Sequence, residues 1–259
     1  MATDDEGVRV LVTGFGPFQH FTINPSFEIV SRLPPSLPGI RVLAHPDPLR
    51  SVYRSLLETA PRLIREHRPD VVVHVGLAPD QTYFCVEQSA SRDGYHQVPD
   101  MERRVLTKAE SRTVFNNSGG GAGKNKKKNM VVSPEVLETS FDLPGVLEAW
   151  KRRLSWNPAL SVGGGGGKMG AKAAAKGGKA PSSDAAVDVR HTDDVGNYVC
   201  GLLYYASLAE LAQRGGGGDG SRYVVFLHVP PLRTEEEFHR GSLVLAALVE
   251  TLVEAWEQR

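Results

Sequence analysis

The sequence predicts an α/β fold, specifically a three-layer α/β/α sandwich around a mixed, mostly parallel twisted sheet in a single domain. Three observations predict it. Short β-prone runs alternate along the chain with longer amphipathic segments. Residues 71–76 are almost wholly apolar, which is typical of a central parallel strand covered on both faces. The 259 residues, 41% of them hydrophobic, are enough to bury one sizeable core.

The first half of the chain supplies these elements in alternation. Residues 8–13 are β-rich and end at a Gly-rich turn. A helix follows, with Asn24 as its N-cap and Pro25 at its first position. His74, inside an apolar run, is predicted to be a satisfied core histidine. The next predicted elements are a strand, an amphipathic helix and two further strands, at 41–45, 49–67, 71–76 and 82–87.

The second half continues the alternation around two low-complexity insertions. Residues of about 116–129 and 163–184 are rich in Gly, Lys, Asn and Ala, so we expect disordered surface loops within a single domain of residues 1–259. The polar residues 91–100 are predicted to be a loop. The remaining predicted elements are a helix, a strand, a helix, a strand and a helix, at 143–154, 185–189, 200–214, 223–228 and 234–258.

Composition excludes several classes of function. The 30 basic and 30 acidic side chains balance, and the lysines of 124–128 have no aromatic neighbours, so neither nucleic acid nor an acidic membrane is an expected partner. No apolar run approaches the roughly 20 residues of a membrane span. With only Cys85 and Cys200, neither a disulfide framework nor a zinc site is expected. The start of the chain does not resemble a presequence, and we expect a reducing, cytosolic protein.

The turn Gly14-Phe15-Gly16 follows the first predicted strand. It lacks the third glycine of a dinucleotide loop, and Pro17 removes a backbone donor that a phosphate would require. The turn instead brings Phe15 and Phe18 to the carboxyl end of a strand, where α/β folds bind ligands. Ligand contact and core packing both remain open for these two rings.

Cys200 opens an apolar run that is predicted to be a helix, with Asp193 and Asp194 upstream as candidate caps. His228 ends a later strand. A thiol at a helix start and an imidazole at a strand end are the parts of a thiol hydrolase, although such a cysteine can also be a small buried hydrophobe. Cys85 lies among bulky apolar residues and is predicted to be inert. Glu87 is a carboxylate at a strand end, either solvated or catalytic.

Four blocks of the sequence resemble the pyroglutamyl peptidase I (pyrrolidone-carboxylate peptidase) family, in the family's order and at compatible spacing. The blocks are Val10-Leu11-Val12-Thr13-Gly14-Phe15-Gly16-Pro17-Phe18 with Asn24-Pro25, His74-Val75-Gly76-Leu77-Ala78, Val195-Gly196-x-Tyr198-x-Cys200 and His228-Val229-Pro230. The resemblance covers most of the chain outside the two insertions. It departs from the family at Gln88, where many members have a basic residue, and at Gly201, where Asn or Asp is common.

The resemblance implies a cofactor-free, metal-free cysteine peptidase that removes an N-terminal pyroglutamyl residue from small peptides. It places the catalytic triad on Glu87, Cys200 and His228. It places the substrate pocket on five residues, namely Phe15, Phe18, Val98, Tyr198 and Val199. The oligomeric state is left open. Two alternatives also stay open, a non-catalytic binding or interaction protein on the same fold and a thiol amidase with another small substrate.

The implied chemistry sets requirements on the site. A pyroglutamyl end is an uncharged lactam, so its pocket needs apolar walls and a few backbone partners rather than a carboxylate. Cys200 would attack as a thiolate, His228 would carry its proton, and Glu87 would orient the imidazole. We expect the oxyanion donors to be backbone N–H groups near Cys200 and in the Gly14-Phe15-Gly16 turn.

Overall fold

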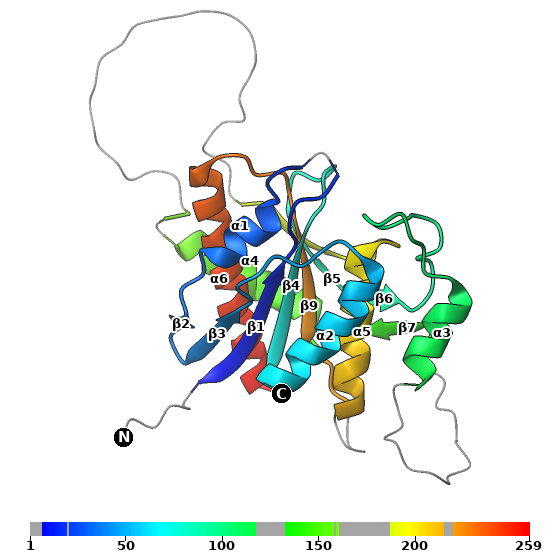
Figure 1. Ribbon diagram of the computed structural model, residues 1–259. Helices are drawn as coiled ribbons and strands as arrows, with labels where there is room; N and C mark the ends of the chain where they lie inside the picture. Colours follow the sequence, from blue (N-terminus) through cyan, green and yellow to red (C-terminus); the bar gives the residue numbers. More distant parts are fainter. Residues whose placement is uncertain (1–6, 20, 118–132, 158, 161–186, 215–219) are drawn as a thin grey trace, which may run out of the picture.

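The computed structural model describes residues 7–19, 21–117, 133–157, 159–160, 187–214 and 220–259 (Figure 1). Within them it confirms a mixed, mostly parallel sheet between two layers of helices. The predicted insertions fall almost entirely on 118–132 and 161–186, which lie outside the described residues.

The main sheet has seven strands in the order β2-β3-β1-β4-β9-β5-β8. Strands β3, β1, β4 and β9 run parallel to one another, and β5 and β8 run parallel to each other. Strand β5 is antiparallel to β9, and the edge strand β2 is antiparallel to β3. The predicted central strand is β4, and it is buried along its whole length. The strands are β1 Val8–Gly14, β2 Ser36–Leu37, β3 Ile40–Ala44, β4 Val71–Leu77, β5 Phe84–Glu87, β8 Val189–Thr192 and β9 Val224–Val229.

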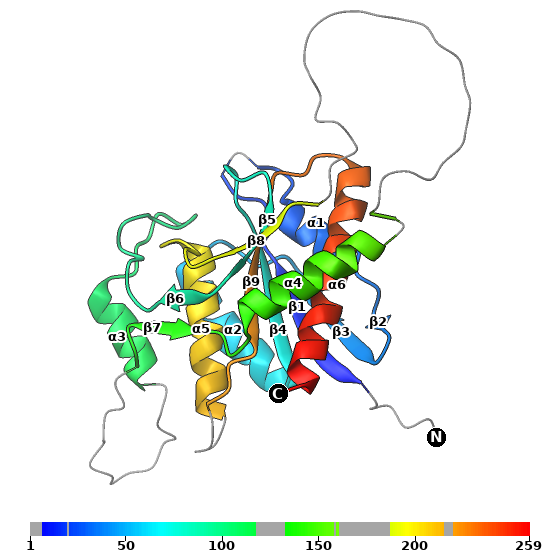
Figure 2. The same cartoon turned by 180° about the vertical axis from the view of Figure 1, so that it is seen from behind.

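Helices cover both faces of this sheet. One face carries α1 Pro25–Ser31, α4 Leu143–Trp156 and α6 Glu235–Glu257, whose apolar side chains pack on one cluster with the strands. The other face carries α2 Tyr53–His67 and α5 Val199–Arg214, which lie side by side. Figures 1 and 2 show the two layers from opposite sides. The helix that carries Cys200 in its first turn thus lies on the α2 face.

The turn after β1 is tied to the start of α1. Asn24 caps the helix by accepting a bond of 3.1 Å from the Ser26 N–H, and Pro25 occupies the first turn, as predicted. The side-chain amide of Asn24 also donates to the Gly16 carbonyl at 2.8 Å, and the Phe15 N–H donates to the Ser26 hydroxyl at 3.0 Å. The cap therefore also fixes residues 14–18, which carry Phe15 and Phe18 and are called the aromatic turn below.

His74 is a core histidine, as predicted. It is 1% exposed, and its two ring nitrogens lie 2.7 Å from Thr13 Oγ1 and 2.7 Å from Ser207 Oγ. Burial lowers the pKa of His74 to about 3, so the ring is neutral at physiological pH. The imidazole links β1, β4 and α5 by hydrogen bonds rather than by charge.

A small second unit beside α5 was not predicted. Strands β6 Ser89–Ser91 and β7 Val136–Glu138 form an antiparallel pair, and α3 Lys108–Asn117 lies beyond them (Figure 1). Residues 116–117, assigned from sequence to an insertion, belong to this helix. The polar composition of this region hid these elements, because they are short and only partly buried.

Two predicted boundaries were wrong. The helix α2 begins at Tyr53 rather than at residue 49, because Leu49 pairs with the aromatic turn: its N–H donates to the Gly14 carbonyl and its carbonyl accepts from Gly16 N–H, each at 2.9 Å. The strand predicted at 185–189 begins at Val189 as β8.

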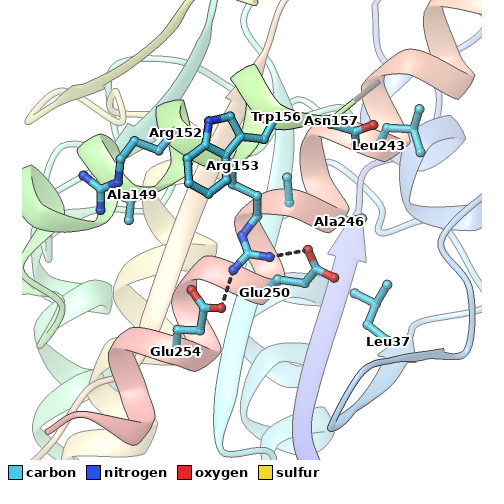
Figure 3. A pocket seen from close by; sticks show the side chains of 11 residues that line it. Leu37, Ala149, Arg152, Arg153, Trp156, Asn157, Leu243, Ala246, Glu250 and Glu254 are labelled. Atoms are coloured by element: carbon cyan, nitrogen blue, oxygen red, sulfur yellow. Dashed lines mark hydrogen bonds and ion pairs between the residues drawn. The ribbon is translucent and has the colours of Figure 1, made fainter. Parts of the chain in front are cut away.

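A hollow lies between α4 and α6, on the helical face opposite α5 (Figure 3). Arg153 spans it with an ion pair of 2.9 Å to Glu250 and a second one to Glu254. Trp156 stands at its edge and is 82% exposed. The sheet separates this hollow from the thiol of Cys200.

Candidate active site

Glu87 and His228 meet across the antiparallel strands β5 and β9. The Glu87 Oε1 atom lies 2.7 Å from His228 Nδ1. Glu87 is fully buried and His228 is 7% exposed, so water competes little with this hydrogen bond. The bond leaves Nε2 as the ring nitrogen that is available to another group.

Cys200 is the second residue of α5, and its sulfur lies against β4 beside His228. Gly76 pairs with His228 in the β4–β9 register, and a Cβ atom built on Gly76 would lie 3.1 Å from Cys200 Sγ and 2.7 Å from the Phe226 ring. A side chain at position 76 would collide with the Phe226 ring and crowd the thiol. This glycine, which was not singled out from the sequence, gives the sulfur its place.

The three side chains form one hydrogen-bonded group. Burial lowers the pKa of His228, but hydrogen bonds to the side chains of Cys200 and Glu87 raise it more, to about 9 from an ordinary value of 6.5. The imidazole is therefore protonated at neutral pH. A charged imidazole next to a thiol is the pairing that activates cysteine nucleophiles.

The second oxygen of Glu87 is also bonded. Oε2 accepts from the Thr192 hydroxyl at 2.6 Å and from the Asp194 N–H at 3.3 Å. The backbone carbonyl of Glu87 accepts from the Tyr204 hydroxyl at 2.9 Å, which joins α5 to β5 one turn beyond Cys200. Thr192 and Tyr204 were not identified from the sequence, although Thr192 directly precedes the two acids noted there.

The acids before α5 do not cap it, contrary to prediction. The helix starts at Val199, five residues after Asp194, and the Asp193 carboxylate accepts from the Ser89 hydroxyl instead. Neither carboxylate is directed at a donor in the first turn among the bonds of the described residues. The N-terminal end of α5, with its positive dipole, is thus left to face the thiol region.

Two backbone N–H groups of the aromatic turn, expected as oxyanion donors, are already bonded to other acceptors. Phe15 N–H donates to Ser26 Oγ and Gly16 N–H donates to the Leu49 carbonyl, so both are committed. Within the described part of the chain, the N–H groups of Cys200 and Gly201 have no acceptor, as is normal for the first turn of a helix. The first turn of α5 is the better source of donors.

The five expected pocket residues divide into two groups. Phe18 and Tyr198 are partly exposed, and their ring centroids are 5.6 Å apart. Val98 is 42% exposed at the surface. Phe15 and Val199 are each 3% exposed and pack in the core under α2 and α5.

Tyr53, at the start of α2, joins this aromatic group although the sequence did not suggest it. Its ring centroid is 5.8 Å from that of Tyr198, and its hydroxyl donates to the Val98 carbonyl at 2.7 Å. Asp100 accepts from the Tyr53 N–H at 3.0 Å and from two N–H groups of its own loop. These bonds hold the loop that carries Val98 against α2.

At Gly201, where the sequence departs from the resemblance noted above, the structure requires a glycine. A Cβ atom built there would lie 2.2 Å from the Gly196 carbonyl oxygen and 3.2 Å from the Tyr95 hydroxyl. Gly196 has a φ of +78°, which brings its loop close to the helix start. The close approach of this loop leaves no room for a side chain at position 201.

Cys85 is buried, as predicted. It is fully inaccessible to solvent, and burial raises the pKa of its thiol to about 11. Its sulfur lies 3.4 Å from Thr192 Oγ1. Of the two free cysteines, only Cys200 is partly exposed.

Metal-binding side chains do not gather anywhere in the described ranges, where no group of three or more His, Cys, Asp or Glu could hold an ion. In the same ranges, no helix is long and apolar enough to cross a membrane.

Comparison with known proteins agrees with this arrangement. A family model described as pyroglutamyl peptidase matches residues 8–115. The pyrrolidone-carboxylate peptidase of Thermococcus onnurineus is 38% identical over 95 residues, which are 37% of this chain and 46% of that protein. The chain thus spans less than half the length of this relative, and the residues that the family model matches include Glu87 but neither Cys200 nor His228.

A longer match covers the rest of the chain. Pyroglutamyl-peptidase 1 of Homo sapiens is 23% identical over 249 residues, which are 96% of this chain and 91% of that protein. The chain is thus similar to pyroglutamyl peptidases, over residues 8–115 by the family model and over most of its length by the human protein. The crystal structure of the pyrrolidone carboxyl peptidase of Pyrococcus furiosus has the same fold, with a TM-score of 0.66 at 18% identity over 96% of this chain and 100% of that one.

Proposed function

We propose that this protein is a cysteine-type omega peptidase that removes an N-terminal pyroglutamyl residue from peptides. The observation that carries the proposal is the buried Glu87–His228 pair, which is hydrogen-bonded to the thiol of Cys200 at the start of α5. A binding protein would have no use for a buried carboxylate that orients an imidazole toward a thiol.

The first half of the reaction is acylation. The Cys200 sulfur, its proton held by His228, attacks the pyroglutamyl carbonyl, and N–H groups in the first turn of α5 stabilise the oxyanion. The His228 imidazolium then gives its proton to the leaving nitrogen, so that the C–N bond breaks and a free peptide amine departs. A pyroglutamyl thioester remains on Cys200.

The second half is deacylation. The imidazole, now neutral, takes a proton from a water molecule that attacks the thioester carbonyl. The C–S bond breaks, pyroglutamic acid leaves, and the proton on His228 again faces the sulfur. Glu87 keeps the ring in one tautomer throughout and stabilises the imidazolium.

The aromatic group supports a lactam substrate. The rings of Phe18 and Tyr198 present apolar surface beside the nucleophile, with Phe15 and Val199 packed beneath and Val98 at the rim. An uncharged five-membered ring fits such walls, whereas the ammonium of an unmodified N-terminal residue would lose its hydration there. We expect small peptides as partners, with neither nucleic acid nor membrane, and a reducing cytosol as the compartment that keeps the thiol free.

The proposal is tested with a pair of fluorogenic amides, pyroglutamyl and glutaminyl, which differ in whether the N-terminus is closed into a lactam. We expect release of the fluorophore from the first and not from the second. Folded protein that cleaves neither would support the non-catalytic binding protein. Cleavage of small amides without preference for the lactam would support a thiol amidase of different specificity.

A further inference from the structure

Thr192 is the one side chain, within the described residues, that bonds the Glu87 carboxylate on the side away from His228. It is the last residue of β8, in register with Glu87 of β5. Its hydroxyl lies 2.6 Å from Oε2, whereas the other donor to that oxygen, the Asp194 N–H, is 3.3 Å away. Oε2 therefore depends mainly on this hydroxyl.

The direction of the bond follows from the donors present. An ionised carboxylate has no proton to give, so the hydroxyl proton of Thr192 points to Oε2. Cys85 Sγ, at 3.4 Å from Oγ1, then faces an oxygen lone pair, to which its S–H can donate. Hydrogen bonds thus join Thr192 to Glu87 and Glu87 to His228, the imidazole beside Cys200.

This bond controls how the carboxylate is turned. With Oε2 held, Oε1 is directed at His228 Nδ1. Without it, the carboxylate is free to rotate about its terminal bond and both oxygens compete for one ring nitrogen. Because Glu87 is fully buried, water cannot readily supply the missing donor. The hydroxyl thus acts on the imidazole through Glu87 without approaching the reacting atoms.

We propose that Thr192 is a positioning residue for the triad: its hydroxyl fixes the Glu87 carboxylate, and through it the orientation of His228 toward Cys200. The expected effect of Thr192 on peptide hydrolysis rests on the proposed function. It also makes a claim about thiol reactivity that holds without any substrate.

The test compares Thr192→Val with Thr192→Ser. Valine keeps the shape and removes the hydroxyl, and serine keeps the hydroxyl. Two readouts are used, kcat and KM on the pyroglutamyl amide, and the rate of Cys200 alkylation by iodoacetamide, followed by mass spectrometry. The matched control is Thr251→Val, which removes another buried threonine hydroxyl, bonded to the Ala247 carbonyl at 2.7 Å in α6.

We expect Thr192→Val to lower kcat by about tenfold or more, as the loss of a hydrogen bond to a charged group does, with KM within about twofold. Cys200 alkylation should slow as well. Thr192→Ser should keep both rates near the wild-type values, and Thr251→Val should not change them. If the valine variant does not fold, Thr192→Ala provides the same comparison.

Wild-type rates in Thr192→Val, or a serine variant as impaired as the valine one, would overturn the role of the hydroxyl. If the wild-type protein cleaves no pyroglutamyl amide, the proposed function fails while alkylation still decides the role of Thr192. Slowed alkylation in the valine variant alone would support it.

Discussion

Glu87 Oε1 and His228 Nδ1 share a hydrogen bond of 2.7 Å between two residues that are almost wholly buried. The two strands that carry them are antiparallel neighbours, so the contact is built into the sheet rather than into a mobile loop. Together with the thiol of Cys200, it raises the pKa of His228 to about 9.

This pKa predicts the alkaline limit of activity. Acylation needs the imidazolium, so kcat/KM should fall as pH rises through about 9. Glu87 raises the pKa of His228, and Glu87→Gln removes that charge, so the fall should begin at lower pH in the variant. The pH profiles of kcat/KM for the two proteins measure the shift.

The same shift has a consequence for stability. Because the folded-state pKa of His228 lies above its ordinary 6.5, protonation stabilises the folded protein fully below pH 6.5, and this contribution disappears between pH 6.5 and about 9. An alkaline limit that is identical in Glu87→Gln and wild type would contradict the account of the pair.

Tyr53→Phe should affect substrate binding more than chemistry. The change removes the 2.7 Å bond from the Tyr53 hydroxyl to the Val98 carbonyl and loosens the loop at the pocket rim. We expect KM to rise a few-fold, with kcat nearly unchanged. Tyr205→Phe is the matched control, since it removes a tyrosine bond to the Pro134 carbonyl away from the pocket. Equal effects of both variants on KM would show that the rim is not held in this way.

Gly201→Ala should lower both stability and activity. The new methyl group would lie 2.2 Å from the Gly196 carbonyl oxygen, so the loop or the start of α5 must move. Overpacking of this kind costs about 1–3 kcal/mol, and urea unfolding measures it. A variant with wild-type stability and kcat would mean that the loop yields freely and that its contact with the helix start has no role.

Much of the fold could be predicted from the sequence because its periodic signals are strong. The apolar run around His74 identified a central strand, and Asn24-Pro25 identified a helix start that the structure confirms. The pair β6–β7 and α3 could not be predicted, because their polar sequences resemble loops and tertiary contacts with α5 hold them.

The site was predictable as residue types more than as contacts. Glu87, Cys200 and His228 were chosen from a motif, and the structure brings them together. Gly76 and Thr192 act from other strands, and no spacing in the chain links them to Cys200. Asp193 looked like a helix cap because acids before an apolar run usually are, but Ser89 binds it instead.

The central claim is that Cys200, and not Cys85, is the nucleophile of a pyroglutamyl peptidase. The most direct measurement is the hydrolysis of a pyroglutamyl amide by Cys200→Ser and Cys85→Ser, both shown to be folded by circular dichroism. We expect Cys200→Ser to have no measurable activity and Cys85→Ser to keep most of it. Equal loss of activity in the two variants, or activity that survives in Cys200→Ser, would contradict the account.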